Sequence, residues 1–232
     1  WPYPMPLGNE WYAQQLKRNV QAHHDRGLNI YNYLIHQRFS LAAPEFEFNG
    51  MEMAVGPFRT YGAPGDRRAT KRPSPSPPAY GPTSNSCFNV CPASHALRDA
   101  NVHSLYKRLE YFGEDGVYLD GTGSYHWPCK NTRHGCGYKG PDGKIHPSRP
   151  IFGIRKYMQR IYVAIKSINP DHIINIGDSF GSNPSGFIYA DSTSTGERWH
   201  HLNETRGGAP HVASALPLDV ARHEFTGRQH NM

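Results

Sequence analysis

Three successive units of a helix, a helix-ending residue and a strand constrain the fold of this chain more than any other feature. They comprise residues 10–26 with 28–35, 96–112 with 116–120, and 148–168 with 172–176. In each helix, apolar residues recur three and four positions apart, and Gly27, Gly113 or Asn169-Pro170 follows. Ser148 is expected to cap the third helix. This alternation predicts an α/β fold with a parallel sheet and right-handed crossovers.

The number of strands bears on which α/β fold the chain adopts. Residues 187–190 predict one more strand and residues 87–90 a weaker one, which gives about five, fewer than the eight of a closed barrel. We therefore expect residues 1–232 to be the C-terminal portion of a (β/α)8 TIM-barrel-like fold, an incomplete barrel fragment that opens on Trp1 without an initiator Met. A doubly wound sheet also fits the alternation, but no Gly-rich phosphate loop follows any of these strands.

Long connections follow two of the strands, at about residues 36–86 and 121–147. Connections of this length are uncommon in compact domains unless they serve function. In a barrel the loops after strands form the active-site face, so both connections are expected to surround one pocket.

Asp120 is the principal catalytic candidate. It ends the apolar run 116–120 and precedes Gly121, which places it at the C-terminal end of a strand, where barrel enzymes hold their catalytic side chains. The alternative is an aspartate that forms a turn by binding nearby backbone amides.

Glycoside hydrolysis uses a second carboxyl group about 5–10 Å from the first. Asp178, Asp191 and Glu197 each follow a predicted strand and are expected to reach the same face as Asp120. Glu197 is the best acid on chemical grounds, because Trp199 offers an apolar wall that raises a carboxyl pKa. Asp191 is the next candidate. The alternative for each is a solvated loop carboxylate.

Aromatic, histidine and amide side chains surround these carboxyl groups in the sequence. Sugars present apolar C–H faces and many hydroxyls, so such side chains are the expected lining of a glycan site, although a structural role is the alternative for each. The expected substrate-binding residues are Asn32, His36, Tyr125, Trp127, His134, Asp178 and Trp199.

Four cysteines, Cys87, Cys91, Cys129 and Cys136, allow three interpretations. Disulfides are expected in a secreted enzyme, most simply Cys129 with Cys136 closing the long loop. Zinc binding together with His134 is a second possibility, but the spacings fit no common zinc pattern well. Free buried thiols are the third.

The net charge of +6 raises the question of an anionic partner such as nucleic acid. Much of the excess lies in one loop-like segment, with Arg59, Arg67, Arg68, Lys71 and Arg72 against Asp66. We therefore expect a solvated loop and no nucleic-acid partner. No stretch approaches the roughly 20 apolar residues of a membrane span.

The C-terminal half of the chain resembles the glycoside hydrolase family 123-like proteins, a group of bacterial enzymes. The resemblance is carried by GVYLDGTG, CKNTRHGCGY and HPSRPIFGIRKYMQRIY within residues 116–165, and by residues 187–199 and 221–229. It implies a (β/α)8 barrel that acts on polysaccharide or glycoconjugate glycans outside the cytoplasm. We therefore expect a secreted protein, extracellular or periplasmic.

Family 123 proper contains β-N-acetylgalactosaminidases in which an adjacent Asp-Glu pair assists the substrate's own acetamido group. The matching position here reads Asp120-Gly121. This departure removes the expected acid, so only Asp120 carries over as the strand-end carboxylate.

The sequence thus predicts a glycoside hydrolase in which Asp120 is nucleophile or charge stabiliser and Glu197 or Asp191 the acid/base. No cofactor and no metal is expected at this site. The alternatives are a carbohydrate-binding barrel that has lost its acid/base partner and a zinc-dependent nucleic-acid binder, which the localised charge disfavours.

Overall fold

A computed structural model describes residues 10–40, 43–55, 60–61, 87–121, 128–177 and 184–194 of the chain. Its centre is a parallel sheet of four strands, β1 (Tyr31–Ile35), β5 (Gly116–Asp120), β8 (Ile173–Gly177) and β9 (Ser192–Ser194). The strands lie side by side in chain order, β1-β5-β8-β9, as in a (β/α) barrel, whereas a doubly wound sheet reverses its order. The predicted α/β class with a parallel sheet is confirmed.

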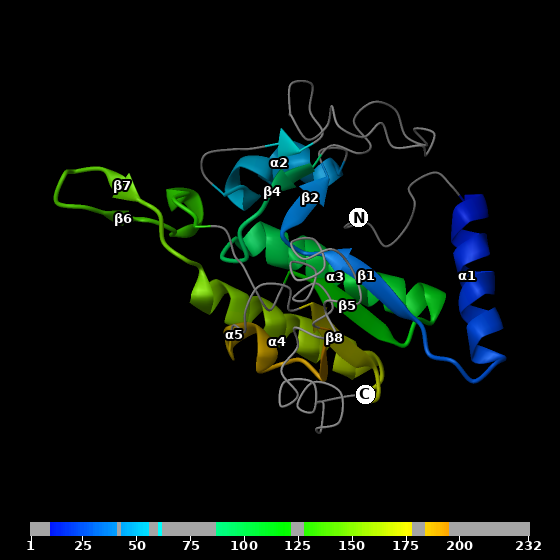
Figure 1. Ribbon diagram of the computed structural model, residues 1–232. Coiled ribbons are helices and arrows are strands. Elements are labelled where there is room, and N and C mark those ends of the chain that lie inside the picture. The colour runs from blue at the N-terminus through cyan, green and yellow to red at the C-terminus, as the bar shows by residue number, and fades with distance from the viewer. Residues whose placement is uncertain are drawn as a thin grey trace, which may run out of the picture.

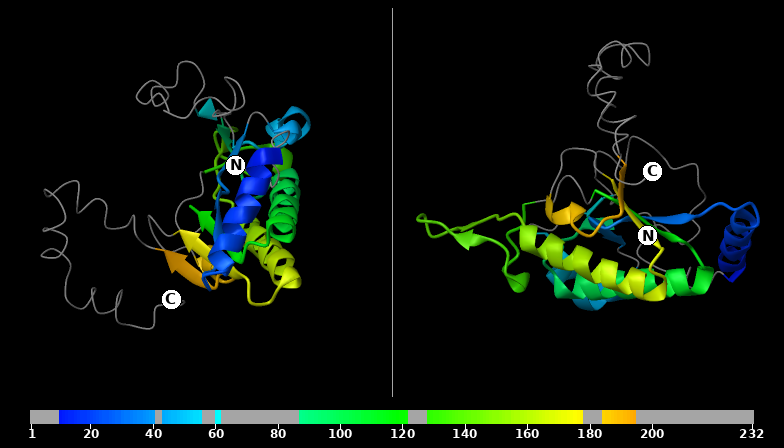
Figure 2. Two further views of the ribbon diagram at one scale, coloured as in Figure 1. Left: turned by 90° about the vertical axis from the view of Figure 1, so that its right-hand side faces the viewer. Right: turned by 90° about the horizontal axis from the view of Figure 1, so that it is seen from below.

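The helices α3 (His95–Phe112) and α4 (Ile151–Ile168) cover one face of this sheet (Figures 1 and 2). Alternate strand residues point toward them, and the main core consists of Leu34, Val117, Leu119, Ile174 and Ile176 from the sheet with Leu105, Leu109, Ile154, Tyr157, Met158, Ile161 and Ile165 from the helices. The other residues of each strand therefore point to the opposite face, which α3 and α4 leave uncovered.

Local signals explain where most of these elements begin and end. Ser94 caps α3 by accepting a hydrogen bond from the Leu97 amide at 3.1 Å, and Gly113 ends it in the left-handed conformation, with φ of 73°. Helix α1 (Glu10–His24) is followed by Gly27, with φ of 71°. The helix ends predicted from Gly27, Gly113 and Asn169 are confirmed.

The predicted cap of α4 is wrong. Pro150 occupies the N-cap position, where no side chain accepts a hydrogen bond, and α4 begins at Ile151. Ser148 Oγ instead accepts a hydrogen bond from the Gly137 amide at 2.9 Å, because the loop that precedes α4 folds back on itself.

The connection after β1 contains a second, antiparallel sheet. Its strands β2 (Arg38–Ser40), β4 (Cys87–Asn89) and β3 (Thr60–Tyr61) pair in that order, and helix α2 (Pro44–Met53) packs against them. Residues 87–90 thus contain a strand, as predicted, but not one of the parallel sheet.

The connection after β5 contains a short 3-10 helix η2 (Thr132–His134) and the hairpin β6 (Tyr138–Lys139) with β7 (Ile145–His146). The hairpin extends away from the body of the protein (Figure 1).

The strand predicted at residues 187–190 is wrong. These residues form the end of the short helix α5 (Pro184–Phe187) and a turn, in which the Ala190 amide donates to the Phe187 carbonyl at 3.0 Å. Phe187, Tyr189 and Ala190 pack against the main core from this turn, so their apolar character reflects burial by a non-strand segment. The neighbouring strand, β9, begins only after Asp191.

In the part of the chain that the structure describes, no helix is both long and apolar enough to cross a membrane. The basic segment with Arg59, Arg67, Arg68, Lys71 and Arg72 lies outside the described residues.

Candidate functional site

The uncovered face of the parallel sheet carries two stacked tyrosines and a carboxylate toward its carboxyl end. The strand register sets Tyr33 of β1 beside Tyr118 of β5, and their ring centroids lie 5.5 Å apart with planes inclined by 26°. Tyr33 is 49% exposed, so the pair forms an accessible apolar surface. Asp120 lies two residues beyond Tyr118 and therefore on the same face.

Asp120 is oriented by its neighbours on this face. The Tyr33 hydroxyl donates a hydrogen bond to Asp120 Oδ2. A Cβ atom at Gly177 of β8 would lie 2.6 Å from the Tyr118 hydroxyl and 3.1 Å from Asp120 Oδ1, so a side chain there would crowd both groups. The glycine thus leaves room for the two polar groups at the end of β5.

The turn after β5 is held by a separate set of contacts. Gly121 has φ of 78°, a conformation that glycine adopts without strain, and Gln37 Nε2 donates to its carbonyl at 2.7 Å. The backbone of the turn is therefore anchored to the connection after β1, while the Asp120 side chain points onto the sheet face.

Two further polar side chains extend this face across the sheet. Asn175 of β8 lies in register with Tyr118, and its Oδ1 accepts a hydrogen bond from Ser194 Oγ of β9 at 3.0 Å. We call Tyr33, Tyr118, Asp120, Asn175 and Ser194 the open-face cluster. Sequence reasoning missed all of it except Asp120. The alternation of side chains along GVYLD pairs Tyr118 with Asp120 and was the available signal.

Asp191 lies at the other end of the sheet from Asp120. Its amide donates to the Ile174 carbonyl, and its Oδ2 accepts from the Ile174 amide at 2.9 Å and pairs with Lys166 Nζ at 2.9 Å. Ile174 is in register with Val117, three residues before Asp120, which corresponds to about 10 Å along the strands. The structure does not bring Asp191 together with Asp120, because the strand expected before Asp191 is a helix and a turn.

His36 is buried and does not face a substrate. It is 1% exposed, and its ring packs against Tyr157 of α4 with centroids 5.8 Å apart. Burial lowers its pKa to about 4, although the negative charge of Asp120 partly opposes this shift. The backbone of Asn32 is in register with Val117, whose side chain is in the core beneath α3 and α4, and the Asn32 side chain lies outside the described residues.

His134 belongs to a compact cluster with three cysteines. Each residue contributes one atom that can bind a metal, a cysteine Sγ or a histidine ring nitrogen. These atoms of Cys91, Cys129, His134 and Cys136 all lie within 4.8 Å of one another. Cys91, Cys129 and Cys136 are free, so the expected Cys129–Cys136 disulfide is absent. His134 Nε2 lies 3.2 Å from Cys129 Sγ, which turns this nitrogen toward the sulfur atoms instead of toward a sugar.

The remaining predicted site residues lie outside the described part of the chain. They are Tyr125, Trp127, Asp178, Glu197 and Trp199. Asp178 directly follows Gly177 in the sequence.

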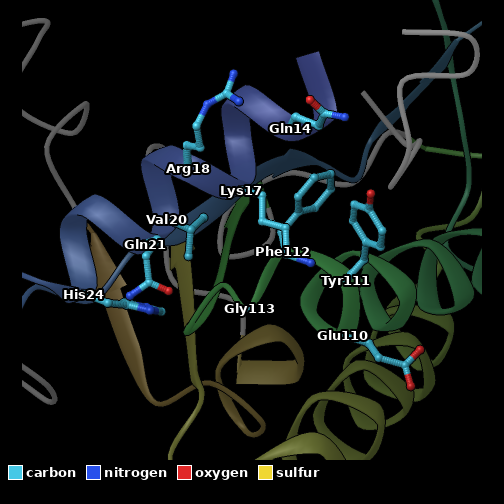
Figure 3. Close-up of a pocket in the computed structure, with 10 residues that line it drawn as sticks. All are labelled: Gln14, Lys17, Arg18, Val20, Gln21, His24, Glu110, Tyr111, Phe112 and Gly113. Carbon is cyan, nitrogen blue, oxygen red and sulfur yellow. The ribbon is translucent and has the colours of Figure 1, made fainter. Parts of the chain in front are cut away.

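A hollow of about 650 Å³ lies elsewhere, between α1 and the end of α3 (Figure 3). Lys17, Arg18 and His24 of α1 line it on one side, and Tyr111 and Phe112 of α3 line it on the other. Because Gly113 lines this hollow and precedes β5, the hollow lies beside the amino end of that strand, away from Asp120.

No family model and no curated protein matches the chain. Among solved structures, the α-galactosidase TtGalA of Thermus thermophilus is 14% identical with a TM-score of 0.42, over 77% of this chain and 29% of that enzyme. The family 36 α-galactosidase AgaA of Geobacillus stearothermophilus is 12% identical with a TM-score of 0.45, over 76% and 21%. A cycloisomaltooligosaccharide glucanotransferase of a Paenibacillus species is 14% identical with a TM-score of 0.45, over 71% and 20%.

These neighbours act on glycans, but the likeness to them is distant and none of the three is described as a family 123 enzyme. The chain spans between about a fifth and three tenths of their length. The functional proposal therefore has to rest on the residues of this chain.

Proposed function

We propose that the chain is part of a glycoside hydrolase acting on a polysaccharide or glycoconjugate glycan, with Asp120 as its strand-end carboxylate. The observation that carries the proposal is the position of Asp120 on the sheet face opposite α3 and α4, beside two stacked tyrosines, at the carboxyl end of a parallel strand. Barrel enzymes place their catalytic groups at this end of the sheet.

The open-face cluster suits a sugar in two ways. The exposed ring of Tyr33, backed by Tyr118, offers an apolar surface for the C–H face of a pyranose. Asn175 and Ser194 provide amide and hydroxyl groups beside it for sugar hydroxyls. A glycan bound at the carboxyl ends of β1, β5 and β8, where the mouth of a barrel lies, would therefore have a glycosidic bond near Asp120.

Asp120 is suited to act as nucleophile or charge stabiliser. The hydrogen bond from Tyr33 holds Oδ2 and leaves Oδ1 on the side of Gly177. In a retaining reaction, a carboxylate oxygen of Asp120 bonds to the anomeric carbon while the glycosidic C–O bond breaks, and an acid gives its proton to the departing oxygen. Water then releases the sugar, and the acid residue recovers its proton from that water.

The acid is proposed to come from Asp178 or Glu197. Asp178 is a candidate because it directly follows β8, whose Gly177 lies beside the Asp120 carboxylate. Glu197 retains its chemical argument, the neighbouring Trp199. Asp191 is not proposed, because its carboxylate binds the backbone and Lys166 at the amino end of the sheet.

The test is hydrolysis of a panel of p-nitrophenyl glycosides and defined oligosaccharides by the full-length protein and its Asp120→Asn variant. We expect kcat to fall by about 10²- to 10³-fold with KM little changed. Asp120→Gly with added azide separates the two roles of Asp120, because azide that takes the place of a lost nucleophile restores turnover and yields a glycosyl azide of inverted anomeric configuration. Normal turnover by Asp120→Asn would refute the assignment.

A carbohydrate-binding barrel without hydrolysis is the second candidate. It is favoured by the fact that Asp120 is the only carboxylate that strand alternation places on this face among the described strand residues. It predicts that the wild-type protein binds an oligosaccharide without cleaving it, and that Tyr33→Ala weakens this binding while Asp120→Asn does not.

The remaining expectations complete the proposal. We propose that other segments of the full-length protein supply the missing strands of a (β/α)8 barrel and that a bacterium secretes the enzyme. The support is the sequential parallel strand order and the resemblance of residues 116–165 to family 123-like proteins.

A further inference from the structure

We infer that Cys91, Cys129, His134 and Cys136 form a structural zinc site that joins the two long connections at the carboxyl end of the sheet. The inference goes beyond the proposed glycoside hydrolysis and does not depend on it. The site chemistry is that of a Cys3His zinc centre, in which three thiolates and one imidazole nitrogen complete a tetrahedron.

The spacing of the four ligand atoms fits one zinc ion. A zinc–sulfur bond of about 2.3 Å places two sulfur atoms of a tetrahedron about 3.8 Å apart. Cys91 Sγ and Cys136 Sγ lie 3.7 Å apart, and all four ligand atoms lie within 4.8 Å of one another. The first value matches the edge of the tetrahedron, and the second is an upper limit that small side-chain movements on metal binding would reduce toward it.

The histidine is already oriented for coordination. Its Nδ1 donates a hydrogen bond to the Glu52 carbonyl at 2.6 Å, which leaves Nε2 as the nitrogen that would bind a metal. Nε2 is the nitrogen that lies beside the cysteines, 3.2 Å from Cys129 Sγ. Metal-binding histidines characteristically hold their second nitrogen in this way.

The sulfur atoms also have an outer layer of contacts. The Asn131 amide donates to Cys129 Sγ at 3.4 Å, a contact that favours a thiolate.

Burial and ligand number point to a structural ion. Cys91 and Cys129 are 0% exposed and Cys136 is 5% exposed, packed with Val55 and Ala93. Four protein ligands leave no position for water or substrate, which is the arrangement of structural zinc sites. Thiolate and imidazole donors favour zinc over magnesium or calcium, which prefer oxygen.

The site would cross-link two connections that are far apart in the sequence. Cys91 follows β4 in the connection after β1, whereas the other three ligands belong to the connection after β5. Asn131 strengthens the same junction, because its Nδ2 donates to the carbonyls of Met51 and Ala54 at 2.8 Å each. Zinc would therefore fix the loops that follow the strands of Tyr33 and Asp120.

The ligand pattern explains why sequence spacing gave a weak signal. Cys129, His134 and Cys136 lie within eight residues, but the fourth ligand, Cys91, is 38 positions before Cys129. The motif therefore becomes visible only after the fold brings the two connections together.

The test is the zinc content and cobalt spectrum of the purified full chain. We expect about one zinc per chain, and titration of the metal-free protein with Co²⁺ should give the visible absorption of tetrahedral cobalt with thiolate charge transfer. Loss of an outer-layer contact weakens metal affinity by about 10- to 100-fold, so His134→Gln and Cys136→Ser should weaken zinc binding by at least about 100-fold.

His146→Gln is the matched control, because His146 is an exposed histidine of the neighbouring hairpin that bonds to Asp142, and it should keep the zinc. Removing zinc from the wild-type chain with a chelator should lower Tm by about 5 °C or more, and added zinc should restore it. A Cys91–Cys136 disulfide in metal-free native protein would overturn the inference. So would unchanged zinc affinity in His134→Gln and Cys136→Ser, or Co²⁺ binding without thiolate charge transfer.

Discussion

The two ends of the parallel sheet use aspartate in different ways. At the amino end, Asp115 accepts a hydrogen bond from the Ile30 amide at 2.8 Å and pairs with His24, and Asp191 accepts from the Ile174 amide and pairs with Lys166. At the carboxyl end, Asp120 accepts from the Tyr33 hydroxyl on the uncovered face. The two carboxylates at the amino end thus bind backbone amides and basic side chains, whereas Asp120 at the carboxyl end binds only a tyrosine hydroxyl among the contacts of its side chain described above.

The largest expected effect concerns the carboxyl end. In the full-length enzyme, Asp120→Asn should reduce kcat by about 10²- to 10³-fold, equivalent to about 3–4 kcal/mol of transition-state stabilisation, because a neutral amide neither attacks nor balances a positive anomeric carbon. Thermal unfolding should stay close to wild type, since the side chain lies at the end of its strand, outside the main core. A large fall in Tm together with the loss of kcat would contradict this division of roles.

The next effect is a pH dependence of the free energy of unfolding, which arises from His36, the residue that follows β1. The pKa of His36 is about 4 in the folded protein, against 6.5 in the unfolded chain, because burial disfavours the charged ring. Between about pH 4 and pH 6.5, His36 therefore binds a proton in the unfolded state but not in the folded state. The free energy of unfolding is highest above pH 6.5 and falls by about 3 kcal/mol as the pH drops toward 4.

Denaturant unfolding of wild type and His36→Gln across this pH range measures the effect. Between pH 6.5 and 4, the free energy of unfolding of the variant should fall by about 3 kcal/mol less than that of wild type. Parallel pH profiles for the two proteins would show that His36 is not the responsible group.

A smaller effect is expected at the amino end. Asp191→Ala should lower the free energy of unfolding by about 1–3 kcal/mol, because it leaves the Ile174 amide without the carboxylate and removes the ion pair of Lys166. The kcat of the folded enzyme should be unchanged. If kcat falls as far as in Asp120→Asn while stability is retained, Asp191 is catalytic and the comparison of the two ends fails.

The smallest effect concerns the hydrogen bond on Asp120. Tyr33→Phe keeps the aromatic surface and removes only the hydroxyl, so kcat should fall by about 10-fold or less, equivalent to about 1 kcal/mol. Tyr33→Ala removes the surface as well and should raise KM in addition. Steady-state kinetics on one glycoside would separate the two contributions, and identical KM values for both variants would argue against a stacking role.

The sequence predicted the α/β alternation because its signals are local. Gly27, Gly113 and Asn169 end helices through backbone geometry that depends on few neighbours, and the core stripe of α4 repeats over 18 residues. Asp120 was found because GVYLD precedes a glycine and ends a strand.

Non-local packing decided what the sequence could not predict. Residues 187–190 are as apolar as a strand, but they pack against the core from a turn, which moved Asp191 to the amino end. Tyr33 and Tyr118 are neighbours only through the register of β1 and β5, and Cys91 meets His134 only after two connections meet. His36 was expected to bind substrate because its ring is polar. The ring is instead buried against Tyr157, a contact that the sequence does not show.

The most direct test compares the two aspartates that flank β5. Asp115 directly precedes β5 and Asp120 ends it. Asp115→Ala and Asp120→Ala, made in the full-length protein, each replace one of these carboxylates with a methyl group. Both kcat and Tm are measured for each variant. We predict that Asp120→Ala loses at least about 100-fold in kcat at nearly wild-type Tm, and that Asp115→Ala loses stability at nearly wild-type kcat. Equal kcat for wild type and Asp120→Ala, or the reverse pattern, would contradict it.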